Sequence, residues 1–219
     1  MITVSMISMN EEKAVGKVIA DIKLHLPQAQ VLLVDSSSDR TPEIARAAGA
    51  KVIRQYPPQG YGPAMDRALR EADGEVVVTM DCDDTYPPGR IAEMADMILK
   101  GRYDLVDASR LQKKPAAMPW INFLANWGFA RLASLLFWRR LTDLHSGMRA
   151  YRKSMIDEME FNAQGPALPV ELLLKPLAQG RRVGTIFIDY RERVGETTLD
   201  PLASAWWTLK RILHCRFRA

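Results

Sequence analysis

The stretch Val76-Val77-Val78-Thr79-Met80-Asp81-Cys82-Asp83-Asp84 decides the fold. Its first five residues form a β-branched and apolar run, which is the pattern of a buried strand. Three carboxylates follow within four positions. Ligands bind at the carboxyl ends of strands in open α/β sheets, and Mg²⁺ or Mn²⁺ binds there through one or two carboxylates and substrate phosphates. The stretch therefore predicts either a metal site or an acidic turn that only solvates the end of the strand.

The surrounding sequence predicts an α/β protein. Apolar strand-like runs at residues 2–7, 31–34, 51–53 and 76–80 alternate with segments of helical spacing. Such alternation is typical of a mostly parallel central sheet with helices on both faces. The first strand is followed by no G-x-G-x-x-G, and the chain has no P-loop. The second strand ends in Asp35, which either accepts a hydrogen bond from a nucleoside or forms an ordinary Asx turn.

The 219 residues fit one domain with at most a small appendage, and 47% hydrophobic with 26% charged residues is ordinary for a globular protein. Neither an uncharged membrane span nor a secretory signal is visible, so we expect a cytoplasmic protein, peripheral at the inner face of the membrane. Cys82 and Cys215 have no metal-ligand spacing. The net charge of +4 is concentrated after Arg181, which favours an anionic partner.

Six motifs occur in the order seen in glycosyltransferase family 2: Ser8-Met9-Asn10-Glu11, Val34-Asp35-Ser36-Ser37-Ser38-Asp39-Arg40-Thr41, Gly60-Tyr61-Gly62-Pro63-Ala64, Met80-Asp81-Cys82-Asp83-Asp84, Ala108-Ser109-Arg110 and Asp143-Leu144-His145-Ser146-Gly147-Met148-Arg149. Within that family the chain resembles the dolichyl- and polyprenyl-phosphate hexosyltransferases over residues 2–199. The resemblance implies a GT-A fold, a divalent cation and inverting transfer of a hexose from a nucleoside diphosphate sugar to a polyprenyl phosphate.

The resemblance also implies roles for individual residues. The positions that match the family's nucleoside site are Ile7, Met9, Glu11, Asp35, Asp81 and Cys82. The metal ligands implied are Asp81, Asp83 and Thr85, and the catalytic residues implied are Asp83, Arg110 and Arg193. The chain departs from the family pattern at Met9, Ser36 and Thr198, which stand where relatives carry an aromatic, an acidic and a lysine residue.

A phosphate acceptor is already ionised near neutral pH and needs cations to position it rather than a general base. The candidates are Arg110, Lys113, Lys114, Arg131 and Arg149, although Arg149 could instead pair with a carboxylate. A hydroxyl acceptor would need a base, for which the candidates are Asp143, His145 and Glu171. Asp143 is equally suited to capping, and a lone histidine is more often structural.

Two tryptophan-rich stretches, residues 120–140 and 206–213, combine aromatic and basic residues without reaching the length of a span. They predict helices that lie at a membrane surface or, alternatively, pack in the core or between subunits. We therefore divide the chain into a glycosyltransferase domain, 1–199, and a basic C-terminal helix, 200–219.

Three functions stay open at this point: transfer to a polyprenyl phosphate, transfer to a hydroxyl, and nucleotide-sugar binding without catalysis, which the altered nucleoside motif suggests. Nucleic acid is not expected as a partner, since only the basic tail favours it. Homo-oligomers are possible, and the sequence does not decide the base, the sugar or the pathway.

Overall fold

The computed structural model describes residues 1–194 and 201–218, and it contains a mixed seven-stranded sheet in the order β3-β2-β1-β4-β6-β5-β7. The strands are β1 Ile2–Ser8, β2 Gln30–Asp35, β3 Lys51–Arg54, β4 Val76–Thr79, β5 Leu105–Ser109, β6 Arg149–Arg152 and β7 Val183–Phe187. All neighbouring strands are parallel except that β6 runs antiparallel to β4 and β5. The predicted mostly parallel sheet is confirmed.

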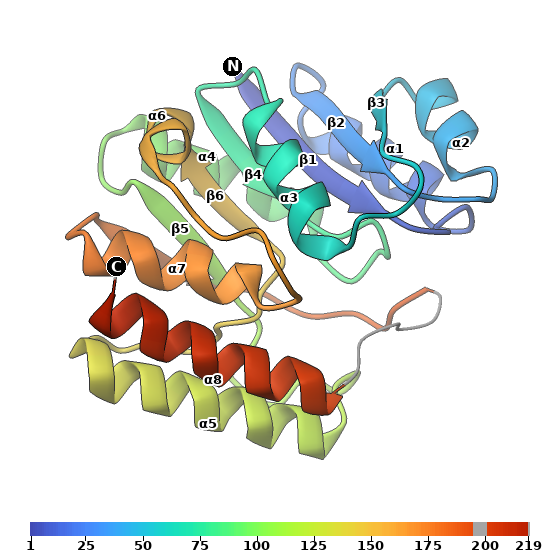
Figure 1. Cartoon of the computed structure of the whole chain (residues 1–219). Helices are drawn as coiled ribbons and strands as arrows, with labels where there is room; N and C mark the ends of the chain where they lie inside the picture. The colour runs from blue at the N-terminus through green and yellow to red at the C-terminus, as the bar shows by residue number, and fades with distance from the viewer. Residues whose placement is uncertain (195–200, 219) are drawn as a thin grey trace.

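Helices cover both faces of the sheet, as predicted (Figure 1). They are α1 Val15–His25, α2 Thr41–Ala47, α3 Tyr61–Arg70, α4 Ile91–Leu99, α5 Trp120–Phe137, α6 Lys153–Glu158, α7 Leu168–Ala178 and α8 Pro201–Phe217, with a short 3₁₀ turn at Pro88–Arg90. The core on one face packs α1 and α4 on the sheet, and the core on the other face packs α3, α6 and α7. The helix expected near the C-terminus is α8, which packs against α7 and α5.

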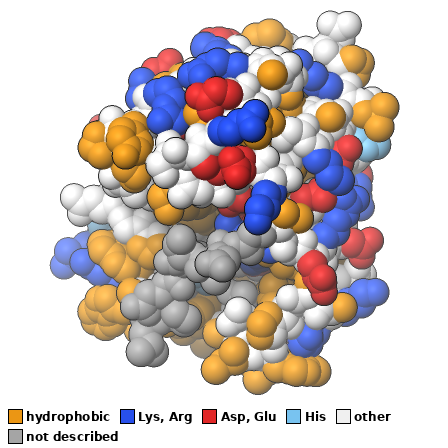
Figure 2. All heavy atoms as spheres, turned by 90° about the vertical axis from the view of Figure 1, so that its right-hand side faces the viewer, with side chains coloured by type: hydrophobic (Ala, Val, Ile, Leu, Met, Phe, Trp, Pro, Cys, Tyr) orange, Lys and Arg blue, Asp and Glu red, His pale blue; other side chains and the backbone are white. Residues whose placement is uncertain are grey.

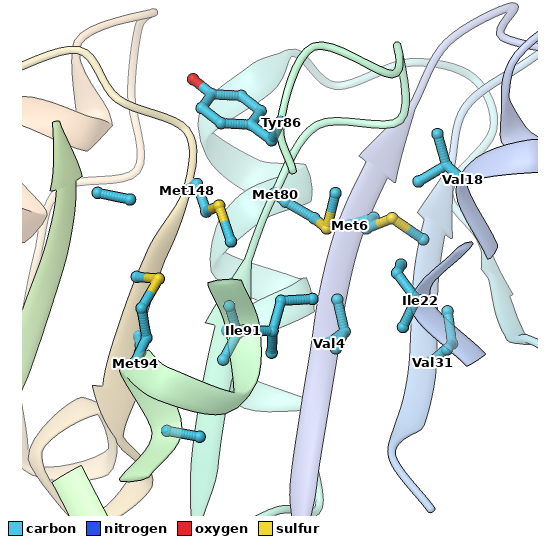
Figure 3. Packing of buried hydrophobic residues seen from close by; sticks show 14 of the residues in the cluster. Val4, Met6, Val18, Ile22, Val31, Met80, Tyr86, Ile91, Met94 and Met148 are labelled. Carbon is cyan, nitrogen blue, oxygen red and sulfur yellow. The ribbon is translucent and has the colours of Figure 1, made fainter. Parts of the chain in front are cut away.

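Side-chain alternation along the strands divides the core into these two parts. Val4 and Met6 of β1 point to the α1 and α4 side, together with Met80 (Figure 3). Val78 of β4 belongs to the same cluster. The residue between Val4 and Met6, Ser5, points the other way and donates a hydrogen bond to the carbonyl of Ala68 in α3. This two-residue period is the geometry of a strand buried on both faces.

The outer layer formed by α5 and α8 differs from the other helices. In α5 only Ala130 and Ala133 are buried, although the whole helix is apolar apart from Arg131 and a few small polar residues. In Figure 1 the two helices lie side by side below α7. Among the described residues, no helix is both long enough and apolar enough to cross a bilayer.

The antiparallel direction of β6 places its amino end at the same sheet edge as the carboxyl ends of β4 and β5. The loop that enters β6, residues 143–148, therefore lies beside the acidic stretch that leaves β4. Two motifs more than 60 positions apart in the sequence meet here because of this reversal.

Candidate active site

Asp83 lies directly beyond β4 and is 3% exposed. The backbone N–H and the hydroxyl of Thr85 both donate to Asp83 Oδ1, at 3.2 and 2.6 Å, so the carboxylate has a fixed orientation. Its other oxygen, Oδ2, lies 3.5 Å from Nε of Arg193. The Thr85 side chain is fully buried and its hydroxyl positions the Asp83 carboxylate. A role of Thr85 as a metal ligand stays a prediction.

Asp81 lies against the backbone of the loop that enters β6. A Cβ atom on Gly147 would come within 2.7 Å of Asp81 Oδ2, so only glycine leaves room for this carboxylate. Gly147 is itself fixed, because its N–H donates to the Tyr86 hydroxyl at 2.7 Å. Burial, and next the charge of Asp83, raise the pKa of Asp81 to about 7. A cation at this place would lower that pKa, because it favours the charged form of both carboxylates.

The donor set suits a hard cation only in part. Asp81 and Asp83 supply carboxylate oxygens, the ligands that Mg²⁺ and Mn²⁺ prefer. Among the described residues, however, no group of three or more histidine, cysteine, aspartate or glutamate side chains could enclose an ion. The side chains therefore fit a metal whose remaining ligands are water or the phosphates of a bound molecule.

Arg193 joins Asp83 to a second strand end. Its Nη2 lies 2.8 Å from Oε1 of Glu11, which follows β1. Burial raises the pKa of Glu11, whereas the Arg193 guanidinium acts in the opposite direction. Thr198, which stands where relatives carry a lysine, lies outside the described residues.

Asp35 is fully buried at the carboxyl end of β2 and already has three partners. Ser8 and Ser37 donate their hydroxyls to Oδ1 at 2.7 and 2.6 Å, and Arg54 forms an ion pair with Oδ2. The register explains the contacts, because Asp35 faces Ser8 on one neighbouring strand and Arg54 on the other. The contact of Asp35 with a nucleoside stays a prediction, and a ligand that reached this carboxylate would also meet the half-exposed Arg54.

Three other residues expected at the nucleoside differ in their accessibility. Met9 is exposed and Ile7 is half-buried, so both are available for contact. Cys82 is 2% exposed and its Sγ lies 3.6 Å from the sulfur of Met6 in the core. The Cys82 side chain therefore faces the core and only its backbone can face a ligand, so a contact of Cys82 with the nucleoside stays a prediction for the backbone.

Arg110 is held by the loop that enters β6. Its Nε and Nη2 donate to the two oxygens of Asp143, at 2.7 and 3.0 Å. The guanidinium carbon lies 5.1 Å from the centre of the Tyr190 ring, and this ring packs edge-on against Tyr86. The ion pair is bidentate and the guanidinium lies over an aromatic ring, a geometry that fixes the guanidinium plane.

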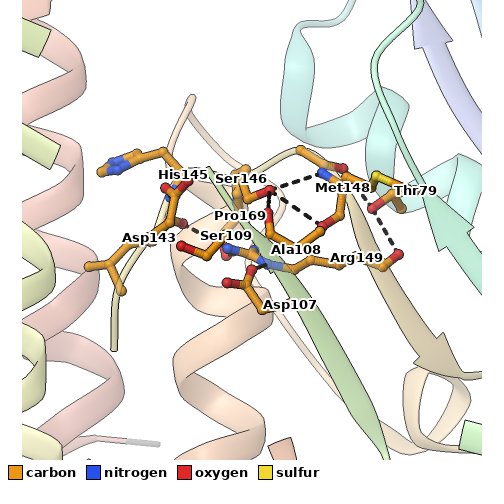
Figure 4. A network of polar contacts seen from close by, with 12 residues as sticks. Thr79, Asp107, Ala108, Ser109, Asp143, His145, Ser146, Met148, Arg149 and Pro169 are labelled. Atoms are coloured by element: carbon orange, nitrogen blue, oxygen red, sulfur yellow. Dashed lines mark hydrogen bonds and ion pairs between the residues drawn. The ribbon is translucent and has the colours of Figure 1, made fainter. Parts of the chain in front are cut away.

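Arg149 does not reach the acceptor site, which corrects the expectation from the sequence. It is 1% exposed, and its Nε donates to Asp107 at 2.6 Å, its cross-strand neighbour on β5 (Figure 4). The remaining nitrogens donate to the carbonyls of Leu144 and Pro169. The guanidinium therefore bonds to groups in the protein interior, and its bond to Pro169 connects the sheet to α7.

Three expected acceptor cations lie near α5. Lys114 Nζ and the guanidinium carbon of Arg131 each lie 5.1 Å from a tryptophan ring, those of Trp120 and Trp127, and Lys113 is exposed. Arg131 also lines a groove of about 640 Å³ between α5 and the segments on either side of it. The other lining residues are Leu111, Gln112, Phe123, Trp127, Ala130, Ser134, Leu135, Trp138, Arg139, Arg140, Leu141 and Thr142.

The candidate general bases are poorly suited to that role. Burial acts to raise the pKa of Asp143, but Arg110 outweighs it and the pKa falls to about 2. Burial lowers the pKa of His145 to about 4, and its Nε2 is 2.8 Å from the Thr208 hydroxyl. Glu171 is buried in an ion pair with Arg211. A base that works near neutral pH needs a pKa near 7, which Asp143 and His145 lack, and access to the substrate, which the buried and paired Glu171 lacks.

Four aromatic or charged residues that hold the site together were not expected from the sequence: Arg54, Tyr86, Asp107 and Tyr190. Arg54 could have been found, because it ends a predicted strand beside the one that carries Asp35. The other three depend on the position of β6 in the sheet, which no local pattern in the sequence reveals.

The chain resembles known proteins over almost its whole length. The family model of glycosyl transferase family 2 matches residues 3–160. A dolichyl-phosphate hexose transferase of Haloferax volcanii is 46% identical over 203 residues, which is 92% of this chain and 88% of the relative. A dolichol-phosphate mannosyltransferase of Pyrococcus furiosus is 32% identical over 153 residues, which is 66% of this chain and 43% of the relative.

A solved structure shows the same fold. The glucosyl-3-phosphoglycerate synthase of Mycobacterium tuberculosis superposes with a TM-score of 0.79 at 21% identity, over 99% of this chain and 80% of that one. Such an identity supports the fold alone, whereas the family match covers most of the sequence. The chain therefore belongs to glycosyl transferase family 2 and is a glycosyltransferase with the GT-A fold.

Proposed function

We propose that the protein transfers a hexose from a nucleoside diphosphate sugar to a polyprenyl phosphate, with Mg²⁺ or Mn²⁺ as its cofactor. The observation that carries this proposal is the meeting of Asp83, Glu11 and Arg193 at the carboxyl ends of β1 and β4. Two carboxylates and a guanidinium at one point suit a diphosphate and its metal ion. The donor sugar would then lie between this point and Arg110.

The chemistry needs charge stabilisation on the leaving group. When the bond from sugar to phosphate breaks, the nucleoside diphosphate gains negative charge, and the bound metal supplies Lewis-acid stabilisation of that charge. Asp83 and Asp81 would hold the metal, and Arg193 would donate hydrogen bonds to the phosphates. In support, a crystal structure of the mycobacterial synthase contains Mn²⁺ and uridine diphosphate.

A phosphate acceptor fits the site better than a hydroxyl. Asp143 and His145 have low pKa values and Glu171 is buried in an ion pair, so none of the three candidates suits the role of base, and an ionised phosphate needs none. Residues 108–142 contain six lysines and arginines and no acidic residue. The names of the Haloferax and Pyrococcus relatives point to the same acceptor. Arg110 and Arg131, with Lys113 and Lys114, are the cations we assign to it.

The protein would reach the acceptor lipid through a membrane-facing surface formed by α5 and α8. Of fifteen large hydrophobic side chains exposed in the described part of the chain, nine lie on these helices or at the end of α5. They are Trp120, Ile121, Leu124, Trp127, Leu135, Trp138, Trp206, Leu213 and Phe217. Neither helix contains an acidic residue. Exposed aromatic groups with flanking cations suit the headgroup region of an anionic bilayer.

The surface view agrees with this assignment. In Figure 2 the lower edge of the molecule, where α5 and α8 lie in Figure 1, shows hydrophobic side chains, whereas acidic side chains occur higher on that face. We accordingly keep the division into a catalytic part, 1–199, and a C-terminal helix, 200–219, as part of the proposal.

The test compares two neighbouring aspartates. Asp83→Asn should lower the rate of transfer of radiolabelled hexose to a short polyprenyl phosphate about a thousandfold or more, because the metal loses its main carboxylate. Asp84→Asn is the matched control, since Asp84 is the next residue but pairs with Lys17 and Arg191 on the surface. Full activity of the Asp83 variant would refute the metal assignment. A product stable to mild acid would instead indicate transfer to a hydroxyl.

A further inference from the structure

The guanidinium of Arg193 stands beside the carboxylates that we assign to a metal. Its Nη2 is 2.8 Å from Glu11 Oε1 and its Nε is 3.5 Å from Asp83 Oδ2. The Asp83 and Glu11 side chains are 5% and 11% exposed, whereas that of Arg193 is 37% exposed. A partly exposed cation thus contacts two largely buried anions.

The backbone holds Arg193 in this position from both sides. The N–H of Val194 donates to the carbonyl of Asp83 at 3.1 Å, and the N–H of Arg191 donates to the carbonyl of Thr85 at 3.0 Å. Both bonds join the segment that carries Arg193 to the acidic loop itself. The guanidinium is therefore a tethered ligand with a high effective concentration at these carboxylates.

We propose that Arg193 is the resident cation of this site, and that the site takes the complex of a divalent metal with a nucleoside diphosphate rather than the free metal ion. The proposal rests on the proposed function and concerns how its donor and cofactor bind. Charge balance is the reason. A free metal ion at Asp83 would have to displace Arg193 from that carboxylate, and it would place a second cation beside the guanidinium without a further anion.

A metal that arrives with a diphosphate brings that anion. The phosphates complete a coordination shell for which the described side chains offer too few ligands. They also accept hydrogen bonds from the displaced guanidinium, and phosphate is a strong partner for arginine. The exchange replaces the ion pairs of Arg193 without leaving a buried charge unpaired. Arg193 should thus oppose free metal and favour the metal–diphosphate complex.

The experiment measures binding of Mn²⁺ to the whole protein, by electron paramagnetic resonance of the free ion, with and without a nucleoside diphosphate. Arg193→Gln should bind free Mn²⁺ about tenfold more tightly than the wild type, because the competing charge-assisted bonds are lost. The same variant should bind uridine or guanosine diphosphate in the presence of Mn²⁺ about tenfold more weakly. Tighter binding of free Mn²⁺ together with weaker binding of the diphosphate in this one variant would support the exchange of Arg193 from the carboxylates to the phosphates.

Arg191→Gln is the matched control, because it removes the same charge from the same segment but pairs with Asp84 at 3.5 Å. An equal gain in Mn²⁺ affinity in both variants would reduce the effect to general electrostatics and overturn the proposal. So would an unchanged or weaker affinity of Arg193→Gln for free Mn²⁺. Failure of the wild type to bind any diphosphate would refute the proposed function, whereas the arm with free Mn²⁺ reports on Arg193 alone.

Discussion

Arg110 and Asp143 form a bidentate ion pair, with Nε to Oδ2 at 2.7 Å and Nη2 to Oδ1 at 3.0 Å, although 33 residues separate them in the sequence. The backbone N–H of Arg110 also donates to Oδ2, at 3.2 Å. Asp143 therefore fixes both the backbone and the side chain of Arg110. The pair explains why an acid that looked like a candidate base instead orients a cation.

Arg110→Lys should lower transfer about a hundredfold while the protein stays folded, because lysine keeps the charge but loses the fork that Asp143 orients. The measurement is the turnover rate at saturating donor, with the melting temperature as a check on folding. Arg182→Lys is the control, since Arg182 also binds an aspartate, Asp104, through Nε and Nη2 but lies on the surface. Equal losses in both variants would contradict the assignment of Arg110.

Arg149→Met should destabilise the protein by about 3–5 kcal/mol, because it leaves the buried Asp107 carboxylate without its partner. Burial already raises the pKa of Asp107 to about 6, against the effect of Arg149. Urea unfolding measures the loss. The double variant with Asp107→Leu should recover part of it, and a double variant as unstable as the single one would count against the ion pair as the cause.

His145 should make the protein less stable in mild acid. Its pKa is lowered to about 4 by burial, from an ordinary value of 6.5, so between these values the unfolded chain binds a proton and the folded protein does not. The free energy of unfolding therefore falls as the pH falls through this interval, by about 2 kcal/mol between about pH 7.5 and about pH 5.

Urea unfolding of the wild type and of His145→Gln at both pH values checks this expectation, since the variant should lack this part of the loss. His25→Gln replaces an exposed histidine and should keep the pH dependence of the wild type. The same dependence in all three proteins would show that His145 does not remain neutral in the fold.

Trp206→Ser should weaken binding to vesicles that contain phosphatidylglycerol by about tenfold, because a 67% exposed tryptophan no longer enters the headgroup region. Cosedimentation with vesicles measures the binding. Vesicles of phosphatidylcholine alone should bind less protein, since the cations of α8 find no anionic lipid. Tyr56→Ser is the control, because Tyr56 is 62% exposed but follows β3 at the other end of the sheet. Equal binding by all variants would exclude α8 from the contact.

Local sequence patterns were sufficient to predict the strands β1 to β4. The strands that end in Asp35 and near Asp83 are buried on both faces, so they appear as continuous apolar runs that end in polar residues. The parallel arrangement then places their carboxyl ends together. The positions of Asp35 and Asp83 at one edge of the sheet followed from that rule, whereas Glu11 was named only through the family resemblance.

The second half depended on pairing that the sequence does not display. β6 has only four residues and is inserted antiparallel between β4 and β5. Its register places Arg149 opposite Asp107 and so withdraws it from the acceptor site. The same insertion brings Asp143 to Arg110. Residue type and motif made Arg149 and Asp143 candidates for the active site, but only the strand register shows which residues they pair with.

The sequence by itself determined the family motifs, the acidic strand end and the cation-rich, aromatic helices, because each is encoded by neighbouring residues. Tertiary structure alone decided which charges remain available to a ligand. Asp35, Asp143 and Arg149 are paired within the protein, whereas the guanidinium of Arg193 is more than one-third exposed. The physical reason is that a buried charge must find a partner, and that partner is set by which strands lie side by side.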